Sequence, residues 1–360
     1  MRVIQVLTTL SFGDAVGNDT VALQNVLDEM GFNSSIYAEN IDPRLKKNNV
    51  EYIDKIGNLK DEDVIIYHLS TGTDLNYWIK KQKCRKIMIY HNITPPYFFR
   101  EYNKGSQLLC EMGYEQVKLL NDTFDVIYAD SEYNMQELRK MGYKCDIKVL
   151  PILIPFEDYE KVPNRKVISK YDTKDCVNIV FVGRIAPNKK QENVIKTFYE
   201  YHKNYNINSK LFLVGSYSGL ENYYQRLVDY YQALGLTNDD VIFTGHIKFD
   251  EILAYYKIAD IFLCMSEHEG FCVPLVEAMC FNVPIIARDT SAIGYTMENS
   301  GVLLKDNSLL EYAGMINYLI ENKEFRERVV ERQRERLKEY SNKKVIGLFK
   351  NYLKEFLGNI

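Results

Sequence analysis

The feature that most constrains the fold of this chain is a repeated alternation of short apolar runs with longer amphipathic segments. Four apolar runs in the first half are each closed by polar residues: "FNSSIYAE", "DVIIYHLS", "KIMIYHNI" and "DVIYADS". Such runs are typical of parallel strands that are buried on both faces. Segments with helical spacing accompany them, such as "DTVALQNVLDEMG", which stops at a glycine. The pattern predicts an α/β fold with a doubly wound parallel sheet.

The alternation occurs twice along the chain. A second series begins with "VNIVFVG" and continues through "SKLFLVGS", "VIFTG", "DIFLCMS" and "VPIIARD", with helices expected near 220–235 and 249–258. Between 147 and 175 a proline-containing and then charged stretch interrupts the pattern, and we interpret it as the connection between domains. A length of 360 residues suits two domains. We predict domains at 1–160 and 161–340, and a C-terminal helix at 341–360 that packs back on the first domain.

Composition excludes several classes of protein. A net charge of −4 gives no bulk attraction to nucleic acid, so no nucleic-acid partner is expected. The seven cysteines are odd in number and form no C-x-x-C pair, which favours reduced thiols and argues against structural zinc. The apolar run at the N-terminus is too short for a signal sequence, and no stretch approaches the ~20 apolar residues of a membrane span. We therefore expect a cytoplasmic protein.

The first turn of the second series, "VFVGRIAPNKKQ", places two cations after a predicted strand. Gly183 permits a tight exit from the strand, and Arg184 and Lys189 follow before a helix. Cations beside a helix N-terminus form a site suited to a pyrophosphate. The guanidinium offers a fork for two oxygens, and the ammonium supplies a mobile point charge. The alternative interpretation is a solvated basic loop.

A second motif, "EHEGFCVPLVEAM" at 267–279, carries two glutamates eight residues apart. Glu269 lies in a loop after the predicted strand "DIFLCMS", and Glu277 lies in a helix that begins near Pro274. Backbone N–H groups at 271–273 would face the carboxyl end of the strand, where open α/β sheets bind ligands. Because carboxylates repel phosphate, the two glutamates are expected to accept hydrogen bonds from ribose or sugar hydroxyls. The alternative is one solvated loop acid and one partner of the helix dipole.

These motifs together resemble a known family. The combination of "GRIAPNK", "EGFCVPLVE", "VPIIARD" and, in the first half, "YHNITPP" resembles the retaining family 4 glycosyltransferases of the GT-B fold over nearly the whole chain. The wording of "HNITPP" and "CMSEHEGFCVPLVEAM" looks most like bacterial enzymes that assemble O-antigen or capsule, several of which look like mannosyltransferases. The resemblance implies two Rossmann-like domains facing a central cleft. The first would bind the acceptor and the second the nucleotide-sugar donor.

The resemblance also assigns roles to residues. Arg184 and Lys189 would neutralise the diphosphate leaving group, and Glu269 would contact hydroxyls of the donor sugar. Glu277 would hold the ribose hydroxyls, and His91 would face the reacting sugar. The implied catalytic set is His91, Arg184, Lys189 and Glu269. The implied nucleotide-binding and donor-binding set is Gly17, Gly183, Gly215, Ile247, Gly270, Phe271, Cys272, Val273 and Glu277.

Three positions carry reservations of their own. A lone histidine at a strand end, such as His91, is more often structural, although the "NITPP" turn after it is rigid. The first loop, "SFGDAVGND", spaces its glycines four apart where many family members have two adjacent glycines. Gly17 directly precedes the helix and is the glycine expected to approach the phosphates. Cys272 stands where a glycine is frequent, and its side chain is expected to narrow the space beside the sugar.

The implied reaction is the transfer of a hexose, with mannose favoured, to a glycan or lipid-linked acceptor. The donor would be GDP-mannose or, second, a UDP-hexose, and configuration would be retained through same-face attack. No metal or other cofactor is expected, because Arg184 and Lys189 already supply positive charge. The letters "DED" at 61–63 match a D-x-D metal motif, but they precede a strand and are interpreted as a solvated turn.

Other interpretations remain beside this one. A nucleotide-sugar epimerase would share the architecture, and a non-catalytic GT-B protein would share the fold. A dinucleotide oxidoreductase needs G-x-G-x-x-G, which "GDAVGND" does not supply. The basic segment "WIKKQKCRK" at 78–86 would suit contact with an anionic lipid surface, peripheral to the inner face of the membrane. A solvated helix face explains the same segment.

Overall fold

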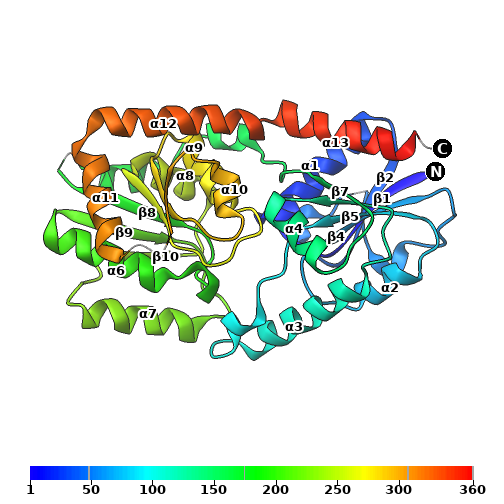
Figure 1. Ribbon diagram of the computed structural model, residues 1–360, viewed down its shortest axis with the longest axis horizontal. Coiled ribbons are helices and arrows are strands. Elements are labelled where there is room, and N and C mark those ends of the chain that lie inside the picture. Colours follow the sequence, from blue (N-terminus) through cyan, green and yellow to red (C-terminus); the bar gives the residue numbers. More distant parts are fainter. Residues whose placement is uncertain (48, 174, 306–307, 359–360) are drawn as a thin grey trace. The chain divides into compact units, whose positions relative to one another are not determined.

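The computed structural model describes residues 1–47, 49–173, 175–305 and 308–358. They form two compact units (Figure 1). Unit 1 comprises Met1–Tyr97, Gly105–Phe156 and Glu339–Ile360, and unit 2 comprises Phe98–Lys104 and Glu157–Lys338. None of the helices in the described part of the chain has the length and apolar character that a bilayer-spanning helix needs.

Unit 1 is built on a seven-stranded sheet with the order β3-β2-β1-β4-β5-β6-β7, in which every pairing is parallel. Its strands are β1 (Arg2–Leu10), β2 (Asn33–Ile41), β3 (Val50–Tyr52), β4 (Val64–Leu69), β5 (Arg85–Tyr90), β6 (Val126–Ala129) and β7 (Asp146–Val149). Its α-helices are α1 (Ala15–Glu29), α2 (Leu75–Lys81), α3 (Lys104–Leu119), α4 (Glu132–Lys140) and α13 (Asn342–Leu357). All residues of β4 and β6 are buried, as expected for strands covered on both faces.

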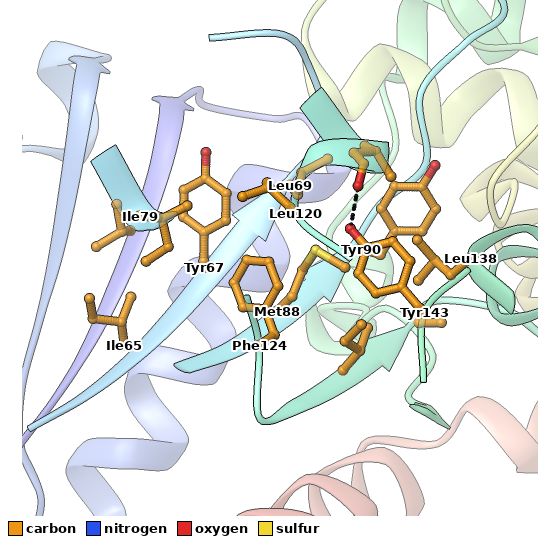
Figure 2. Close-up of a cluster of buried hydrophobic side chains, with 14 of the residues drawn as sticks. Ile65, Tyr67, Leu69, Ile79, Met88, Tyr90, Leu120, Phe124, Leu138 and Tyr143 are labelled. Atoms are coloured by element: carbon orange, nitrogen blue, oxygen red, sulfur yellow. Dashed lines mark hydrogen bonds between the residues drawn. The ribbon is translucent and has the colours of Figure 1, made fainter. Parts of the chain in front are cut away.

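Helices cover both faces of this sheet with separate apolar clusters. One cluster, drawn in Figure 2, gathers Tyr67, Met88, Tyr90, Phe124 and Tyr143 with aliphatic side chains from neighbouring strands and helices. A second cluster joins other strand residues to α1 and to the C-terminal helix α13. The apolar residues of α13 recur at helical spacing, so one face of the helix packs on unit 1. The described part of this helix ends at Leu357, and residues 359 and 360 of the expected 341–360 segment lie outside the described residues.

Unit 2 is built on a six-stranded parallel sheet with the order β10-β9-β8-β11-β12-β13. Its strands are β8 (Val177–Val182), β9 (Ser209–Val214), β10 (Val241–Gly245), β11 (Ile261–Cys264), β12 (Ile285–Arg288) and β13 (Val302–Leu304). Its α-helices are α5 (Arg165–Tyr171), α6 (Gln191–Asn204), α7 (Glu221–Ala233), α8 (Phe249–Ile258), α9 (Val273–Cys280), α10 (Ile293–Met297), α11 (Leu309–Glu321) and α12 (Lys323–Leu337). The short 3₁₀-helices that bear on the site are η4 (Phe156–Glu160) and η5 (Pro187–Lys189).

The stretch expected to be a connection is more structured than its composition indicates. It contains most of strand β7 and the whole of helix α5. β7 is an edge strand of only four residues, so it shows no long apolar run. α5 has no buried residue, and a helix without a buried face leaves only a weak apolar periodicity in the sequence. The chain passes from unit 1 to unit 2 between Phe156 and Glu157, within the stretch 147–175 that was expected to connect the domains, and β7 and α5 lie on either side of this point in sequence.

The interpretation of "DED" as a solvated turn is wrong for its last residue. The side chain of Asp63 is only 2% exposed and forms an ion pair of 2.9 Å with Arg2. It also accepts hydrogen bonds from the backbone N–H groups of Arg2 and Lys60, at 2.8 and 3.0 Å. Asp63 thus fixes the first strand to the turn before β4 and has a structural role.

The ion pair predicts an acid-dependent loss of stability. Burial opposes ionisation of Asp63, but the hydrogen bonds from Arg2 and Lys60 outweigh it and lower the pKa to about 2. A folded pKa below the unfolded value of about 3.9 means that this stabilisation is complete above pH ~4 and is lost as the pH falls toward 2. We expect Asp63→Asn to reduce the free energy of unfolding by about 2 kcal/mol at pH 7.

Urea titrations at pH 7 and pH 2.5 test this prediction. The wild-type and Asp63→Asn proteins should differ at pH 7, and the difference should shrink to less than about half at pH 2.5. The exposed Asp54→Asn variant is the control and should match the wild type at both values, since Asp54 is 70% exposed. A constant gap between wild type and Asp63→Asn would contradict the assignment.

Candidate functional site

The turn after β8 begins the candidate site in unit 2. Gly183 has a φ of 144°, and Arg184 follows it on the surface. The Arg184 guanidinium donates a hydrogen bond of 3.2 Å to the backbone oxygen of Ser218, in the loop after β9. In the structure, Arg184 therefore lies at the carboxyl edge of the sheet, and its side chain is exposed.

Glycines let the ends of three neighbouring strands approach closely. Gly215 follows β9 with a φ of 151°, and it pairs in an isolated bridge with Gly245 at the end of β10. A Cβ atom built on Gly215 would lie 2.0 Å from the backbone oxygen of Gly183. Side chains are thus excluded from Gly215 by backbone contact, and this structural demand exists whether or not a nucleotide binds there.

Two loops that are far apart in sequence are tied together by one side chain and its backbone. The Asn188 amide donates to the His268 backbone oxygen at 3.1 Å, and the Glu267 N–H donates to the Asn188 backbone oxygen at 2.8 Å. Asn188 itself is buried. These bonds fix η5 against the loop between β11 and α9, and they bring Lys189 next to Glu269.

Lys189 and Glu269 form an ion pair. The ammonium lies 2.5 Å from Glu269 Oε2, with side-chain exposures of 22% and 7%. Burial disfavours the charged lysine, but the Glu269 carboxylate outweighs that effect and raises the pKa of Lys189. The Glu269 backbone N–H also donates to the hydroxyl of Ser291 at 2.9 Å. The two predicted catalytic residues therefore lie together, with the ammonium already neutralised by its neighbour.

Glu277 is held by two tyrosines that the motif analysis missed. Its Oε1 accepts from the hydroxyl of Tyr159 at 2.7 Å, and its Oε2 accepts from the hydroxyl of Tyr256 at 2.6 Å. Burial raises the pKa of Glu277, and the two tyrosine bonds oppose that rise. Each carboxylate oxygen has two lone pairs, so acceptor capacity remains for two further hydroxyls. This geometry suits the predicted contact with a ribose diol.

Loss of one tyrosine hydroxyl should weaken any ligand held by Glu277. We expect Tyr256→Phe to raise the dissociation constant of a nucleoside diphosphate by roughly 5- to 30-fold, the equivalent of one charge-assisted hydrogen bond that orients the carboxylate. Calorimetric titration measures it. Tyr255→Phe on the same helix is the control, because Tyr255 packs among Tyr171 and Phe212 instead. Equal affinities for the two variants would contradict the role given to Tyr256.

Helix α9 begins at Val273, four residues after Glu269. Cys272 precedes this helix with a φ of 73°, a left-handed conformation that explains why a glycine is frequent there. Its thiol lies against that of Cys264 within the apolar core of unit 2. The thiol also lies within 4.8 Å of a Glu269 carboxylate oxygen, and the expected narrowing beside a sugar stays a prediction. Phe271 is buried, with its backbone oxygen accepting from the Thr296 hydroxyl, while Gly270 and Val273 are partly exposed.

Ile247 lies after β10 and packs at the margin of the same core. The segment Phe98–Lys104, which precedes α3 in sequence, belongs to unit 2 and not to the first domain as predicted. Asn103 donates to the Gly219 backbone oxygen at 2.6 Å, and the ring of Tyr102 meets that of Tyr223 at 5.0 Å. The segment thus borders the loop that accepts the Arg184 hydrogen bond.

Gly17 lies in unit 1, in the first turn of α1. Its N–H donates to the Asp14 carboxylate at 2.6 Å, as part of the N-cap of the helix. A Cβ atom on Gly17 would lie 2.1 Å from the backbone oxygen of Ser11. Close approach of the preceding loop therefore already requires glycine here, and the expected approach to phosphate stays a prediction.

His91 directly follows β5, and its side chain is 2% exposed. Its Nδ1 lies 2.9 Å from Asp130 Oδ2, and its Nε2 lies 2.9 Å from Nδ1 of His68. Both ring nitrogens are thus engaged within unit 1. Neither ring nitrogen of His91 is therefore left for a sugar hydroxyl, and the expectation that His91 faces a sugar stays a prediction. The sequence analysis missed the partners His68 and Asp130, because each is an isolated polar residue in an apolar run.

Two groups of described residues have side chains that could ligate a metal ion, with ligand atoms within 4.8 Å of one another. One is Asp19, His68 and His91, and the other is Cys264, Glu269 and Cys272. In the second group, Glu269 is already paired with the Lys189 ammonium, which would repel a metal ion bound to the same carboxylate. The prediction that no metal is required stays a prediction.

The fold places this chain among known architectures. Sucrose-phosphate synthase from Thermosynechococcus elongatus superposes with a TM-score of 0.76 at 16% identity, with all of both chains covered. The Anabaena protein HepE in complex with UDP and glucose gives 0.73 at 17%, again over all of both chains. WaaG, a glycosyltransferase involved in lipopolysaccharide biosynthesis, gives 0.70 at 13%, covering 96% of this chain and 97% of its own. The two Rossmann-like parallel-sheet units therefore have the GT-B fold, which confirms the predicted fold class.

The family match lies mainly in the second half of the chain. Residues 164–336 match the family described as "Glycosyl transferases group 1". An uncharacterized glycosyltransferase of Methanocaldococcus jannaschii is 30% identical over 202 residues, which cover 54% of this chain and 50% of the relative. The O-antigen chain mannosyltransferase B of Escherichia coli is 20% identical over 294 residues, 79% of this chain and 72% of its own. The chain thus spans about half the length of the first relative, and the resemblance to group 1 glycosyltransferases is confirmed at this coarser level.

Proposed function

We propose that this protein is a glycosyltransferase that uses a nucleotide-diphosphate sugar. The observation that carries the proposal is the arrangement at the carboxyl edge of the unit 2 sheet. There an exposed arginine and a lysine–glutamate pair lie in the turns after β8 and β11, and a tyrosine-held glutamate lies in α9. This edge is where open α/β sheets bind ligands. The match of residues 164–336 to group 1 glycosyltransferases supports the same assignment.

Each group has a part in the proposed reaction. Glu277 binds the ribose diol of the donor, and Arg184 stabilises the negative charge that develops on the departing diphosphate. Glu269 accepts from hydroxyls of the donor sugar, and Lys189 holds that carboxylate in place while adding positive charge near the phosphates. Donors of this type, preorganised toward developing charge, are the largest single source of catalysis in many enzymes.

We propose GDP-mannose as the donor, a glycan or lipid-linked acceptor, and a role in bacterial surface polysaccharide synthesis. Support comes from the relatives named as O-antigen and serotype-specific mannosyltransferases of Escherichia coli. Retention of configuration by same-face attack is part of the proposal. The second candidate is a UDP-hexose, the donor type named in the HepE structures, although that likeness is one of fold.

We also propose that transfer needs no metal ion. The test is release of nucleoside diphosphate from GDP-mannose and UDP-glucose with a panel of lipid-linked and free glycan acceptors, with and without EDTA. Activity with one donor that persists in EDTA supports both the proposed sugar transfer and its independence of metal ions. Activity abolished by EDTA and restored by Mg²⁺ or Mn²⁺ would contradict metal independence alone. The anomer of the product, determined by NMR, tests retention, and an inverted product would contradict it.

A further inference from the structure

A row of hydrogen bonds crosses four neighbouring strands of unit 1. Gln5 lies in β1, His68 in β4, His91 directly after β5 and Asp130 directly after β6, and these strands are adjacent in the sheet. The contacts join Gln5 Oε1 to His68 Nε2, His68 Nδ1 to His91 Nε2, and His91 Nδ1 to Asp130 Oδ2, each at 2.9 Å. Gln5, His68 and Asp130 are each at most 2% exposed. The row is therefore shielded from water along its length.

The two imidazoles meet edge to edge. Their planes differ by 4° and their centroids lie 5.2 Å apart, while the two facing nitrogens are only 2.9 Å apart. The contact is therefore an in-plane N–H···N hydrogen bond and not a face-to-face stack. A metal ion between the same nitrogens would need about 2.0 to 2.1 Å to each, which this separation does not provide at a tetrahedral angle.

The protons in the row can be assigned from its first residue. The Gln5 amide nitrogen donates to the Thr20 backbone oxygen at 3.0 Å and to Gln24 Oε1 at 3.2 Å, so the other amide atom is the oxygen. That oxygen can only accept, so His68 carries its proton on Nε2. Burial lowers the pKa of His68 well below its usual range, so its Nδ1 is an acceptor. His91 must then donate from Nε2.

We propose that Gln5 and His68 are positioning residues that fix a proton on Nε2 of His91 and prevent this histidine from acting as the base. The other ring nitrogen shares a proton with Asp130. Burial disfavours charge on His91, but the Asp130 carboxylate outweighs it and raises the pKa of His91. The carboxyl groups of Asp14, which caps α1, and of Asp19, within α1, also interact electrostatically with this imidazole.

The catalytic consequence rests on the proposed function. During transfer, the bond from the acceptor oxygen to the sugar C1 forms and the bond from C1 to the leaving phosphate oxygen breaks. The acceptor hydroxyl proton must go to a base. Since His91 carries hydrogen on Nε2 and is paired at Nδ1, it cannot accept this proton. In the proposed same-face attack the proton goes to the leaving phosphate oxygen, which gains the electron pair of the broken bond. His91 contributes a fixed N–H dipole, because its Nε2 proton and its contact with Asp130 stay in place during the step.

The direct test is ¹⁵N NMR of the protein labelled at histidine. The chain has five histidines, and single His→Gln variants assign them. The exposed His246 supplies a reference signal. We expect His68 as the Nε2–H tautomer and His91 with hydrogen on Nε2. A His68 signal of the Nδ1–H tautomer in the wild type would overturn the proposal. Shifts of both signals to metal-bound values on addition of Zn²⁺ alone would overturn it in favour of a metal site.

A matched pair of variants tests the role of Gln5. Gln5→Leu removes the oxygen that sets the direction of the row, so His68 should convert to the Nδ1–H tautomer. Gln24→Leu removes an equally buried amide, but it leaves the Gln5 oxygen in place and should preserve the tautomer. An unchanged His68 tautomer in folded Gln5→Leu would overturn the proposal.

Kinetics separate this inference from the proposed function. Gln5→Leu should lower kcat by on the order of 10-fold with little change in KM for the donor, the scale seen when a supporting hydrogen bond is removed. Gln24→Leu should keep kcat. If the protein transfers no sugar, the proposed function fails while the NMR result still tests the row. If it transfers sugar but kcat of Gln5→Leu equals that of Gln24→Leu, only the positioning role fails.

Discussion

Replacing Arg184 by alanine is expected to lower the turnover number by roughly 100- to 1000-fold without changing the melting temperature. Loss of one donor aimed at developing charge typically costs ~2.7 to 4 kcal/mol of barrier, which corresponds to that range. Arg184 is exposed and lies at the edge of the sheet, so its removal creates no cavity. The measurement is release of nucleoside diphosphate by the purified variant, with melting followed by circular dichroism.

Arg328→Ala is the matched control for this prediction. Arg328 is an exposed arginine of the same unit, paired with Glu324 one helical turn away on α12. Its loss should leave both turnover and melting temperature within error, because exposed pairs of this kind contribute little. Equal turnover for the Arg184 and Arg328 variants would contradict the role assigned to Arg184. A melting temperature lowered only in the Arg184 variant would indicate a structural role in its place.

The second large effect is expected at Gly215. Alanine there would adopt a φ of 151°, and its Cβ would lie 2.0 Å from the Gly183 backbone oxygen. A side-chain rotation can relieve neither the unfavourable φ nor the clash with the backbone oxygen. The ends of β8 and β9 would therefore have to separate at the turn that carries Arg184. We expect a loss of at least roughly 3 kcal/mol in the free energy of unfolding. Urea unfolding followed by tyrosine fluorescence measures it.

Gly347→Ala provides the contrast. Gly347 lies within α13, and a Cβ there would meet no atom within 4 Å. Alanine should therefore stabilise this helix by about 1 kcal/mol relative to glycine. We therefore expect Gly215→Ala to lower the free energy of unfolding and Gly347→Ala to raise it. A Gly215→Ala protein as stable as the wild type would contradict the described packing of the three strand ends.

Much of the fold could be predicted because its strands are buried on both faces. A strand such as β8 shows an apolar run in which Asn178 is the one polar residue, and α8 was predicted over the residues that it occupies. The edge strand β7 and the segment Phe98–Lys104 could not be predicted in the same way. β7 has too few apolar residues, and the segment joins unit 2 through partners more than one hundred residues away, such as Gly219. Such contacts leave no local periodicity.

The candidate site was predictable where a motif carries it, and not where a partner is a common residue. The spacing within two loops was enough to bring Lys189 and Glu269 to the same edge of the sheet. It did not show that they pair with each other, since that depends on how Asn188 ties the loops together. Tyr159 and Tyr256 could not be distinguished among 28 tyrosines, although they position Glu277.

The histidine row shows a different limit. His91 was singled out by its place after a strand, yet its neighbours His68 and Asp130 gave no signal in the sequence. They come together because parallel strands place the residues at their carboxyl ends side by side. The order of strands in the sheet determines which of these residues are neighbours, and no single segment of the sequence shows that order.

We propose that unit 2 binds a nucleotide-diphosphate sugar at the edge that carries Arg184, Glu269 and Glu277. The most direct measurement is calorimetric titration of the wild-type protein and Arg184→Ala with GDP, UDP, ADP and dTDP. We expect one-to-one binding with clear preference for one nucleotide, and we expect this binding to be strongly weakened in Arg184→Ala and unchanged in Arg328→Ala. Absence of binding to all four nucleotides would contradict it, and so would binding that the Arg184 variant retains in full.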